Sequence, residues 1–273
     1  MVSSDWPIGV FDSGMGGLTV LKALKSLLPN ENYIYLGDTA RLPYGTKSAE
    51  TVTAYSLRAA ELIHRHQVKL LVVACNTASS VALPALQAQL SPIPVIGVVT
   101  PGAKACLSAS QSRHVGVLAT ESTVRFDAYS KMIQMLDPDA KISQWPCSFL
   151  VPLVEEGWVE GPLVEQILQK LLAPCIAEIA QSQIDTILLG CTHFPILKTP
   201  LQAVLGDQLC LVDSALTTAE AVKEELSARK LLKEATFPGQ VRIMATDKLT
   251  RFSQVAAVFM GEGVHQEVEW VSL

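Results

Sequence analysis

Short apolar runs alternate along this chain with longer stretches of helical periodicity, and this alternation most restricts what the chain can fold into. Such runs are typical of strands buried on both faces of a sheet. Strands that alternate with helices predict an α/β fold with a mostly parallel sheet flanked by helices. The predicted strands are Ile8–Phe11, Tyr33–Leu36, Leu70–Ala74, Val95–Val99, Val115–Leu118, Ile187–Leu189, Cys210–Val212 and Val241–Met244.

Helices are predicted where apolar residues recur three or four positions apart between these strands. A proline is favourable in the first turn of a helix but stops or kinks a helix further along. The predicted stripes are Leu18-Leu21-Leu24-Leu28, Val52-Tyr55-Ala59-Leu62-Ile63 and Leu163-Ile167-Leu171, the last in a helix that starts near Pro162 and is stopped or kinked at Pro174.

The composition is that of a globular protein and excludes several functional classes. Of the 273 residues, 49% are hydrophobic and 17% charged, and the net charge is −5. Without a run of Lys or Arg, we expect no nucleic-acid partner and no binding to anionic membranes. No apolar stretch reaches the length of a membrane span, and the first residues do not resemble a signal peptide. We therefore expect a cytoplasmic protein whose six cysteines are reduced.

Two strand-and-turn units recur at similar offsets, which suggests two halves. Ile8–Phe11 and its polar turn return 107 residues later as Val115–Leu118, followed by Ala119 and Thr120. Leu71-Val72-Val73-Ala74 and its turn return 116 residues later at Ile187. The alternative is coincidence, because an apolar strand followed by a small polar loop is common. We expect two pseudo-symmetric lobes with a cleft between them, one from residues 1–98 and 215–273 and the other from 99–214.

Each half places a cysteine directly after a buried strand, in Cys75-Asn76-Thr77 and in Cys191-Thr192-His193. Ligands of parallel sheets bind at the carboxyl ends of the strands. Two thiols on either side of a cleft suit a reaction in which one group removes a proton from a carbon and the other delivers a proton to the opposite face. The alternative is simple packing, since cysteine is often buried. Packing is the interpretation we give to Cys106, Cys147, Cys175 and Cys210.

Each thiol needs a neighbouring group that helps it to lose its proton (its helper below), because a free cysteine is mostly protonated at neutral pH. His193 lies two residues beyond Cys191, and Asp12 ends the first strand in the same layer as Cys75. We favour a functional role for His193 over a purely structural one. No spacing of ligands predicts a metal site.

Two glycine-containing turns and a pair of glutamates complete the candidate site. Residues 12–17, with the sequence DSGMGG, join a strand to a helix and are suited to bind an anion, more plausibly a carboxylate than a phosphate. In the turn 42–46, Tyr44 either covers a small ligand or packs on the next helix. Glu155 and Glu156 either contact a ligand ammonium or lie in a solvated helix start.

Five blocks of the sequence form one specific signal: Asp12-Ser13-Gly14-Met15-Gly16-Gly17, Pro43-Tyr44-Gly45, Ala74-Cys75-Asn76-Thr77-Ala78, Val151-Pro152-Leu153-Val154-Glu155-Glu156-Gly157 and Gly190-Cys191-Thr192-His193-Phe194-Pro195. In this order and at this spacing, they resemble the glutamate racemase family from about Ile8 to Ile196. Aspartate racemases share the two cysteine motifs but match the first block poorly, and they are the alternative. One departure is Cys147-Ser148-Phe149-Leu150, where the family usually has proline after the cysteine.

The resemblance implies a cofactor-independent isomerase that interconverts L- and D-glutamate and supplies D-glutamate for peptidoglycan, commonly as a homodimer. Carried over by position, Cys75 deprotonates D-glutamate and Cys191 deprotonates L-glutamate, with Asp12 and His193 as their respective helpers. Tyr44 and Gly45 would close the pocket. The predicted substrate-binding residues are Asp12, Ser13, Pro43, Tyr44, Gly45, Asn76, Thr77, Thr120, Glu155, Thr192 and His193.

Two other classes of protein remain as competing hypotheses. An amidohydrolase would use one cysteine as a nucleophile with His193 as its base, and Cys75 would then be dispensable. An amino-acid-binding module would clamp a ligand between two lobes and leave both thiols without a chemical role.

Overall fold

Two parallel sheets run through residues 2–234, 237–247, 249–260 and 267–273, which are the residues that the computed structural model describes. Within these residues one sheet has six strands in the order β10-β9-β2-β1-β3-β4, and the other has four in the order β6-β5-β7-β8. The first sheet contains β1 (Ile8–Asp12), β2 (Tyr33–Gly37), β3 (Leu70–Val73), β4 (Val95–Gly97), β9 (Val241–Ala245) and β10 (Val268–Trp270). The second contains β5 (His114–Ala119), β6 (Lys141–Pro146), β7 (Thr186–Gly190) and β8 (Cys210–Asp213).

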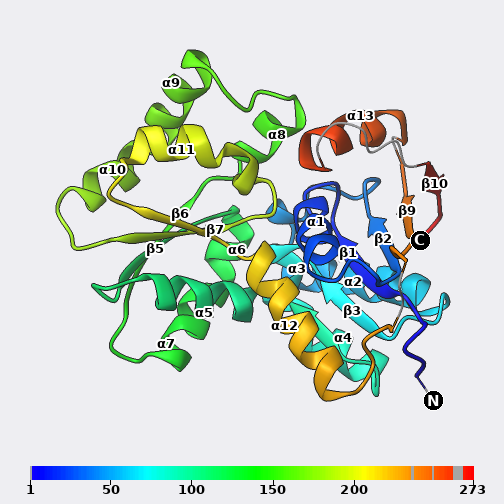
Figure 1. Cartoon of the computed structure of the whole chain (residues 1–273). Coiled ribbons are helices and arrows are strands. Elements are labelled where there is room, and N and C mark those ends of the chain that lie inside the picture. Colours follow the sequence, from blue (N-terminus) through cyan, green and yellow to red (C-terminus); the bar gives the residue numbers. More distant parts are fainter. Residues whose placement is uncertain (1, 235–236, 248, 261–266) are drawn as a thin grey trace.

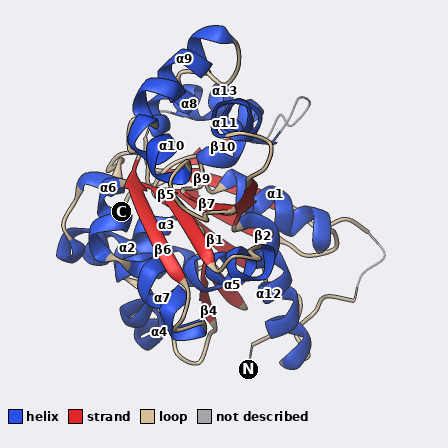
Figure 2. Ribbon diagram, turned by 90° about the vertical axis from the view of Figure 1, so that its left-hand side faces the viewer, coloured by secondary structure: helices blue, strands red, loops and turns tan. Residues whose placement is uncertain are grey.

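Helices cover both sheets, so the predicted α/β class is confirmed (Figure 2). The three predicted helices are present, and Pro174 lies in the first turn of a separate helix, α10. The α-helices are α1 (Leu18–Leu27), α2 (Ala49–His64), α3 (Asn76–Val81), α4 (Leu83–Leu90), α5 (Val99–Ala109), α6 (Glu121–Phe126), α7 (Ala128–Leu136), α8 (Leu150–Glu155), α9 (Pro162–Leu171), α10 (Ala173–Ile179), α11 (Lys198–Leu205), α12 (Ala215–Ala228) and α13 (Leu249–Met260), and the 3₁₀ turns are η1 (Tyr44–Thr46) and η2 (Phe194–Leu197).

The second sheet repeats the strand order of the first. β6-β5-β7-β8 corresponds to β2-β1-β3-β4, so the sequence echo pairs β1 with β5 and β3 with β7. The turns that follow these strands therefore occupy equivalent places at the carboxyl edge of each sheet. This is the reason why the two cysteine turns have matching positions.

The strand assignments differ from the expectation at three places. The predicted strand Val95–Val99 ends at Gly97, and Val99 already begins α5. Two strands have no counterpart among the predicted ones. β6 carries the mixed sequence KISQWP on a sheet edge with only Trp145 buried, and β10 has three mostly exposed residues. Neither has the apolar run by which a buried strand is recognised.

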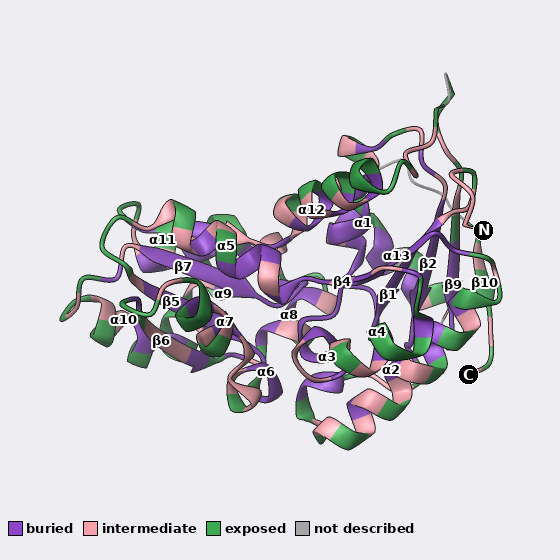
Figure 3. Cartoon of the chain, turned by 90° about the horizontal axis from the view of Figure 1, so that it is seen from below, coloured by how far each residue is buried: buried purple, intermediate pink, exposed green. Residues whose placement is uncertain are grey.

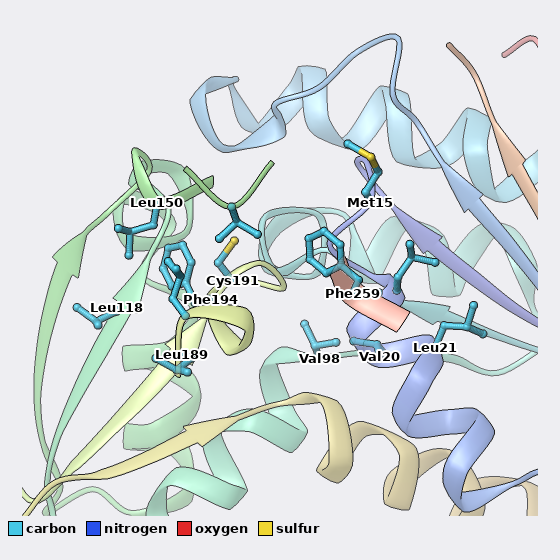
Figure 4. Close-up of a cluster of buried hydrophobic side chains, with 14 of the residues drawn as sticks. Met15, Val20, Leu21, Val98, Leu118, Leu150, Leu189, Cys191, Phe194 and Phe259 are labelled. Atoms are coloured by element: carbon cyan, nitrogen blue, oxygen red, sulfur yellow. The ribbon is translucent and has the colours of Figure 1, made fainter. Parts of the chain in front are cut away.

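The central strands of both sheets are buried, and exposed residues lie on the outward faces of the helices (Figure 3). One hydrophobic cluster extends from Leu21 of α1 to Leu118 of β5 and Leu189 of β7 (Figure 4). The two sheets therefore share a continuous apolar core rather than a solvated gap.

Two helices connect the two sheets. The chain leaves the first sheet at β4 and enters α5, and it returns through α12, which packs against both α1 and α5 (Figure 1). Both helices begin next to the boundaries 98/99 and 214/215, and we propose these positions as the boundaries of the two lobes. The lobe that contains the six-stranded sheet is called lobe A below, and the other lobe B.

Candidate active site

A cavity of about 400 Å³ lies where strand ends of both sheets meet. Both Cys75, which follows β3, and Cys191, which follows β7, line it. Among its described lining residues there is no Lys or Arg, so a carboxylate in the cavity would be met mainly by neutral donors. The lining residues are Ser13, Leu42, Pro43, Tyr44, Gly45, Thr46, Cys75, Asn76, Thr77, Thr120, Ser148, Phe149, Val151, Pro152, Glu155, Cys191, Thr192 and His193.

The turn after β1 holds a buried carboxylate. The backbone N–H of Gly14 donates to Asp12 Oδ2 at 2.9 Å, while Oδ1 is buried without a partner among the described residues. Burial raises the pKa of Asp12, and the nearby charge of His193 opposes this rise. Asp12 therefore lies in an environment where it can accept and hold a proton.

Small residues are required in this turn because lobe B packs directly against it. A Cβ at Gly16 would lie 2.3 Å from Thr192 Oγ1 and 2.5 Å from His193 Nδ1. A Cβ at Gly17 would lie 2.6 Å from the Cβ of Asp12. Gly16 thus allows the close approach of the lobes, and Gly17 allows the turn to fold tightly over Asp12 within lobe A.

Cys75 is buried at the start of α3. Its thiol donates to Ser13 Oγ at 3.4 Å, and its sulfur accepts the N–H of Ala78 at 3.5 Å. Burial raises the pKa of Cys75 to about 12, and the negative charge of Asp12 adds to the rise. At neutral pH the Cys75 thiol therefore carries its proton.

Cys191, His193 and Glu155 form a chain of contacts on the lobe B side. Cys191 Sγ lies 3.8 Å from His193 Nδ1, and His193 Nε2 lies 3.2 Å from Glu155 Oε1. Burial alone lowers the pKa of His193, but the hydrogen bonds to Cys191 and Glu155 outweigh it and raise this pKa to about 10. At neutral pH a buried imidazolium therefore lies beside the Cys191 sulfur. The ring of Phe259 from α13 packs edge-on against the imidazole.

The two adjacent glutamates lie in different environments. Glu155 lines the cavity and is only 12% exposed at its side chain. Glu156 is 62% exposed and forms an ion pair with Arg251 of α13. Glu155 therefore lies in the candidate site, and Glu156 is a surface residue.

Three buried threonine hydroxyls meet across the two lobes. Thr77 Oγ1 lies 3.1 Å from Thr120 Oγ1 and 3.3 Å from Thr123 Oγ1, and the last two are 3.0 Å apart. Thr77 and Thr120 also line the cavity. They present neutral donors to it from opposite lobes.

The 3₁₀ turn η1 forms one wall of the cavity. The Tyr44 hydroxyl donates to Asp38 Oδ2 at 2.6 Å, and its ring packs on Tyr55 of α2. Tyr44 therefore both lines the cavity and packs on the next helix. A Cβ at Gly45 would lie 2.8 Å from the Cβ of Thr120, so this wall also contacts lobe B closely.

The structure brings the predicted site residues together in this one cavity. Asp12 alone among them does not line it, because Asp12 is buried behind the turn that it begins. Six lining residues were not predicted: Leu42, Thr46, Ser148, Phe149, Val151 and Pro152. Ser148 and Phe149 come shortly after β6. The apolar pattern does not predict this strand, so the residues after its carboxyl end could not be recognised as part of the site.

Among the described residues, no group of three or more His, Cys, Asp or Glu side chains is arranged to hold a metal ion. None of the helices in the same residues is long and apolar enough to cross a bilayer. Of the six cysteines, all unpaired, only Cys210 is exposed.

Comparisons of sequence and structure with known proteins also indicate a racemase. A curated glutamate racemase of Syntrophus aciditrophicus is 45% identical over 258 residues, which cover 94% of each chain. The crystal structure of a Francisella tularensis glutamate racemase in complex with D-glutamate superposes with a TM-score of 0.90 at 36% identity, covering 98% of each chain. An aspartate racemase structure of Picrophilus torridus shares the fold, with a TM-score of 0.56 at 16% identity over 83% of this chain and 99% of that one.

The model of the Asp/Glu/Hydantoin racemase family matches residues 8–222, a range that contains both cysteine turns and all the lining residues of the cavity. The chain therefore belongs to the Asp/Glu/Hydantoin racemase family.

Proposed function

We propose that this protein is a glutamate racemase that interconverts L- and D-glutamate with two cysteines and no cofactor. The observation that carries the proposal is the placement of Cys75 and Cys191, two buried thiols from equivalent turns of the two lobes, in the wall of one cavity. The near full-length similarity to glutamate racemases supports glutamate over aspartate as the substrate.

The chemical difficulty is the proton on the α-carbon of the substrate, which is far less acidic than a thiol. One cysteine must remove this proton as a thiolate, so that a new S–H bond forms while the C–H electron pair stays on the α-carbon. The other cysteine must deliver its proton to the opposite face of that carbon. The inverted amino acid then leaves, and the two sulfurs have exchanged protonation states.

The electrostatics support a particular starting state for the conversion of L- to D-glutamate. Cys75 holds its proton because burial raises its pKa to about 12. His193 supplies a positive charge next to Cys191, and an adjacent imidazolium stabilises a thiolate. Cys191 is thus the base toward L-glutamate and Cys75 the acid. In the return direction Cys75 must lose its proton first, and Asp12 is its proposed helper.

We propose that neutral donors in the cavity wall stabilise the carbanion. Negative charge that develops on the α-carbon spreads into the adjacent carboxylate, so hydrogen bonds to that carboxylate strengthen in the transition state. Ser13, Asn76, Thr77, Thr120 and Thr192 offer such donors from the cavity wall. We propose that Pro43, Tyr44 and Gly45 close the pocket, and that Glu155 acts through His193.

We also propose a metabolic role, a location and an oligomeric state for this enzyme. D-glutamate produced in this way would supply peptidoglycan synthesis in the cytoplasm, and the enzyme would act as a homodimer. Sedimentation of the purified protein tests the dimer: a monomer at assay concentration that is fully active would contradict it.

Incubation of the purified protein with L-glutamate in heavy water tests the activity. A racemase makes D-glutamate and incorporates deuterium at the α-carbon without an added cofactor. An amidohydrolase or a simple binding protein does neither, and an aspartate racemase turns over L-aspartate in preference to L-glutamate in the same assay. No D-isomer from either substrate would contradict the proposal.

A further inference from the structure

Asn76 has a buried, unpartnered donor beside the cavity. Its side chain is buried and lines the cavity directly after Cys75, and its Nδ2 has no hydrogen-bond partner among the described residues. A side-chain amide has a donor end and an acceptor end of nearly the same shape. Its orientation therefore decides whether the cavity offers a hydrogen-bond donor or an acceptor at this point.

The orientation is held by a tyrosine from the other lobe. Tyr129 of α7 is fully buried, and its hydroxyl donates to Asn76 Oδ1. Burial raises the pKa of the Tyr129 phenol, so the phenol keeps the proton that it donates, and the nearby Ser214 side chain opposes that rise only in part.

Two glycines fix the position of the tyrosine ring. A Cβ at Gly102 would lie 3.2 Å from the Tyr129 hydroxyl oxygen and 3.1 Å from the Cβ of Ser214. A Cβ at Gly190 would lie 3.0 Å from the Tyr129 ring. The ring thus packs against the backbone just before Cys191 while its hydroxyl reaches the residue just after Cys75, so it connects the two cysteine turns.

We propose that Tyr129 is a positioning residue that holds the Asn76 amide with Nδ2 facing the substrate, where it donates to a carboxylate oxygen of bound glutamate. The inference rests on the proposed function of this cavity. A reversed amide would turn Oδ1 toward that carboxylate, and two acceptors facing each other repel. Tyr129 thereby contributes to substrate binding without touching the substrate.

The test compares Tyr129→Phe with Tyr33→Phe. Tyr33 is also a buried tyrosine, but its hydroxyl contacts only the backbone carbonyls of Leu24 and Leu28 in the described structure, away from the cavity. Tyr129→Phe should raise KM for glutamate about tenfold or more, with a smaller effect on kcat, because an oriented hydrogen bond to a charged group is lost. Tyr33→Phe should leave KM unchanged. Circular dichroism melting shows that each variant is folded.

A double-mutant cycle separates positioning from general damage. In the Asn76→Ala background, Tyr129→Phe should change KM by less than about twofold, since the group through which it acts is gone. An equal rise in KM with and without Asn76, or an unchanged KM in folded Tyr129→Phe, would overturn the inference.

The same assays keep this inference distinct from the proposed function. If the wild-type protein does not racemise glutamate, the proposed function fails. If the wild-type protein racemises glutamate and Tyr129→Phe behaves like it, only the role of Tyr129 fails.

Discussion

Glu155 Oε1 lies 3.2 Å from His193 Nε2, on the side of the imidazole opposite to Cys191. The carboxylate comes from α8 and the histidine from the turn after β7, so the contact joins two segments that are distant in the sequence. It places a buried negative charge where it keeps the ring positively charged beside the thiol.

The Glu155–His193 contact predicts a change in pH dependence for Glu155→Gln. The pKa of His193 is raised to about 10, so the imidazolium is present below that pH and is lost as the pH rises through it. Removing the carboxylate removes one of the causes of the raised pKa. The alkaline fall of kcat/KM for L-glutamate should therefore move to lower pH, by about one unit or more.

The matched control for this pH profile is Glu156→Gln, the same substitution one residue later. Glu156 is exposed and pairs with Arg251, so its variant should keep the wild-type pH profile. Identical alkaline limbs in Glu155→Gln and wild type would show that Glu155 does not act on His193.

Two-base proton transfer predicts that both cysteines of the cavity are essential. Cys75→Ser and Cys191→Ser should each lose racemisation by about a thousandfold or more while staying folded, because a hydroxyl is a far weaker acid than a thiol. Chiral chromatography of the product measures the rate. Cys210→Ser changes the exposed cysteine and should retain full activity. Full activity in either of the first two variants would refute the two-base assignment.

Close contact between the lobes predicts that Gly16→Ala is severe and Gly14→Ala is mild. The new methyl group at Gly16 would overlap Thr192 and His193, whereas at Gly14 the nearest atom is Leu42 Cδ2 at 3.4 Å, an ordinary contact. Overpacking of this kind costs about 1–3 kcal/mol and here displaces the site itself. We expect kcat/KM to fall about a hundredfold or more for Gly16→Ala and less than about threefold for Gly14→Ala, measured on folded protein. Equal losses would contradict this account.

A buried ion pair outside the site predicts a stability effect without a catalytic one. Lys69 Nζ is fully buried, pairs with Glu31, and donates to the carbonyl oxygens of Ser4 and Leu231 at 2.6 and 2.8 Å. Lys69→Met leaves Glu31 buried without its partner charge and should lower the free energy of unfolding by about 3–5 kcal/mol.

Urea denaturation at neutral pH measures the stability of the Lys69 variant. The double variant Lys69→Met/Glu31→Gln removes the stranded charge as well and should recover part of the loss. A double variant less stable than Lys69→Met would show that the cost lies in packing rather than in charge.

Much of the fold was predictable from the chain because buried strands and amphipathic helices leave local patterns. The apolar runs at β1, β3 and β7 are recognisable because both faces of these strands are buried. β6 was not predicted because it lies on a sheet edge, where five of its six residues are exposed or partly exposed and the apolar signal is weak. With that strand unrecognised, Ser148 and Phe149 at the edge of the cavity could not be placed.

The sequence by itself determined the strand and helix pattern and singled out two cysteines among six, because the polar residues that follow each thiol are its neighbours in the chain. Only the tertiary structure decided that these turns meet in one cavity, that Glu155 rather than Glu156 contacts His193, and that Tyr129 reaches Asn76. The physical reason is that such contacts join residues far apart in sequence, and their geometry depends on how the two sheets pack together.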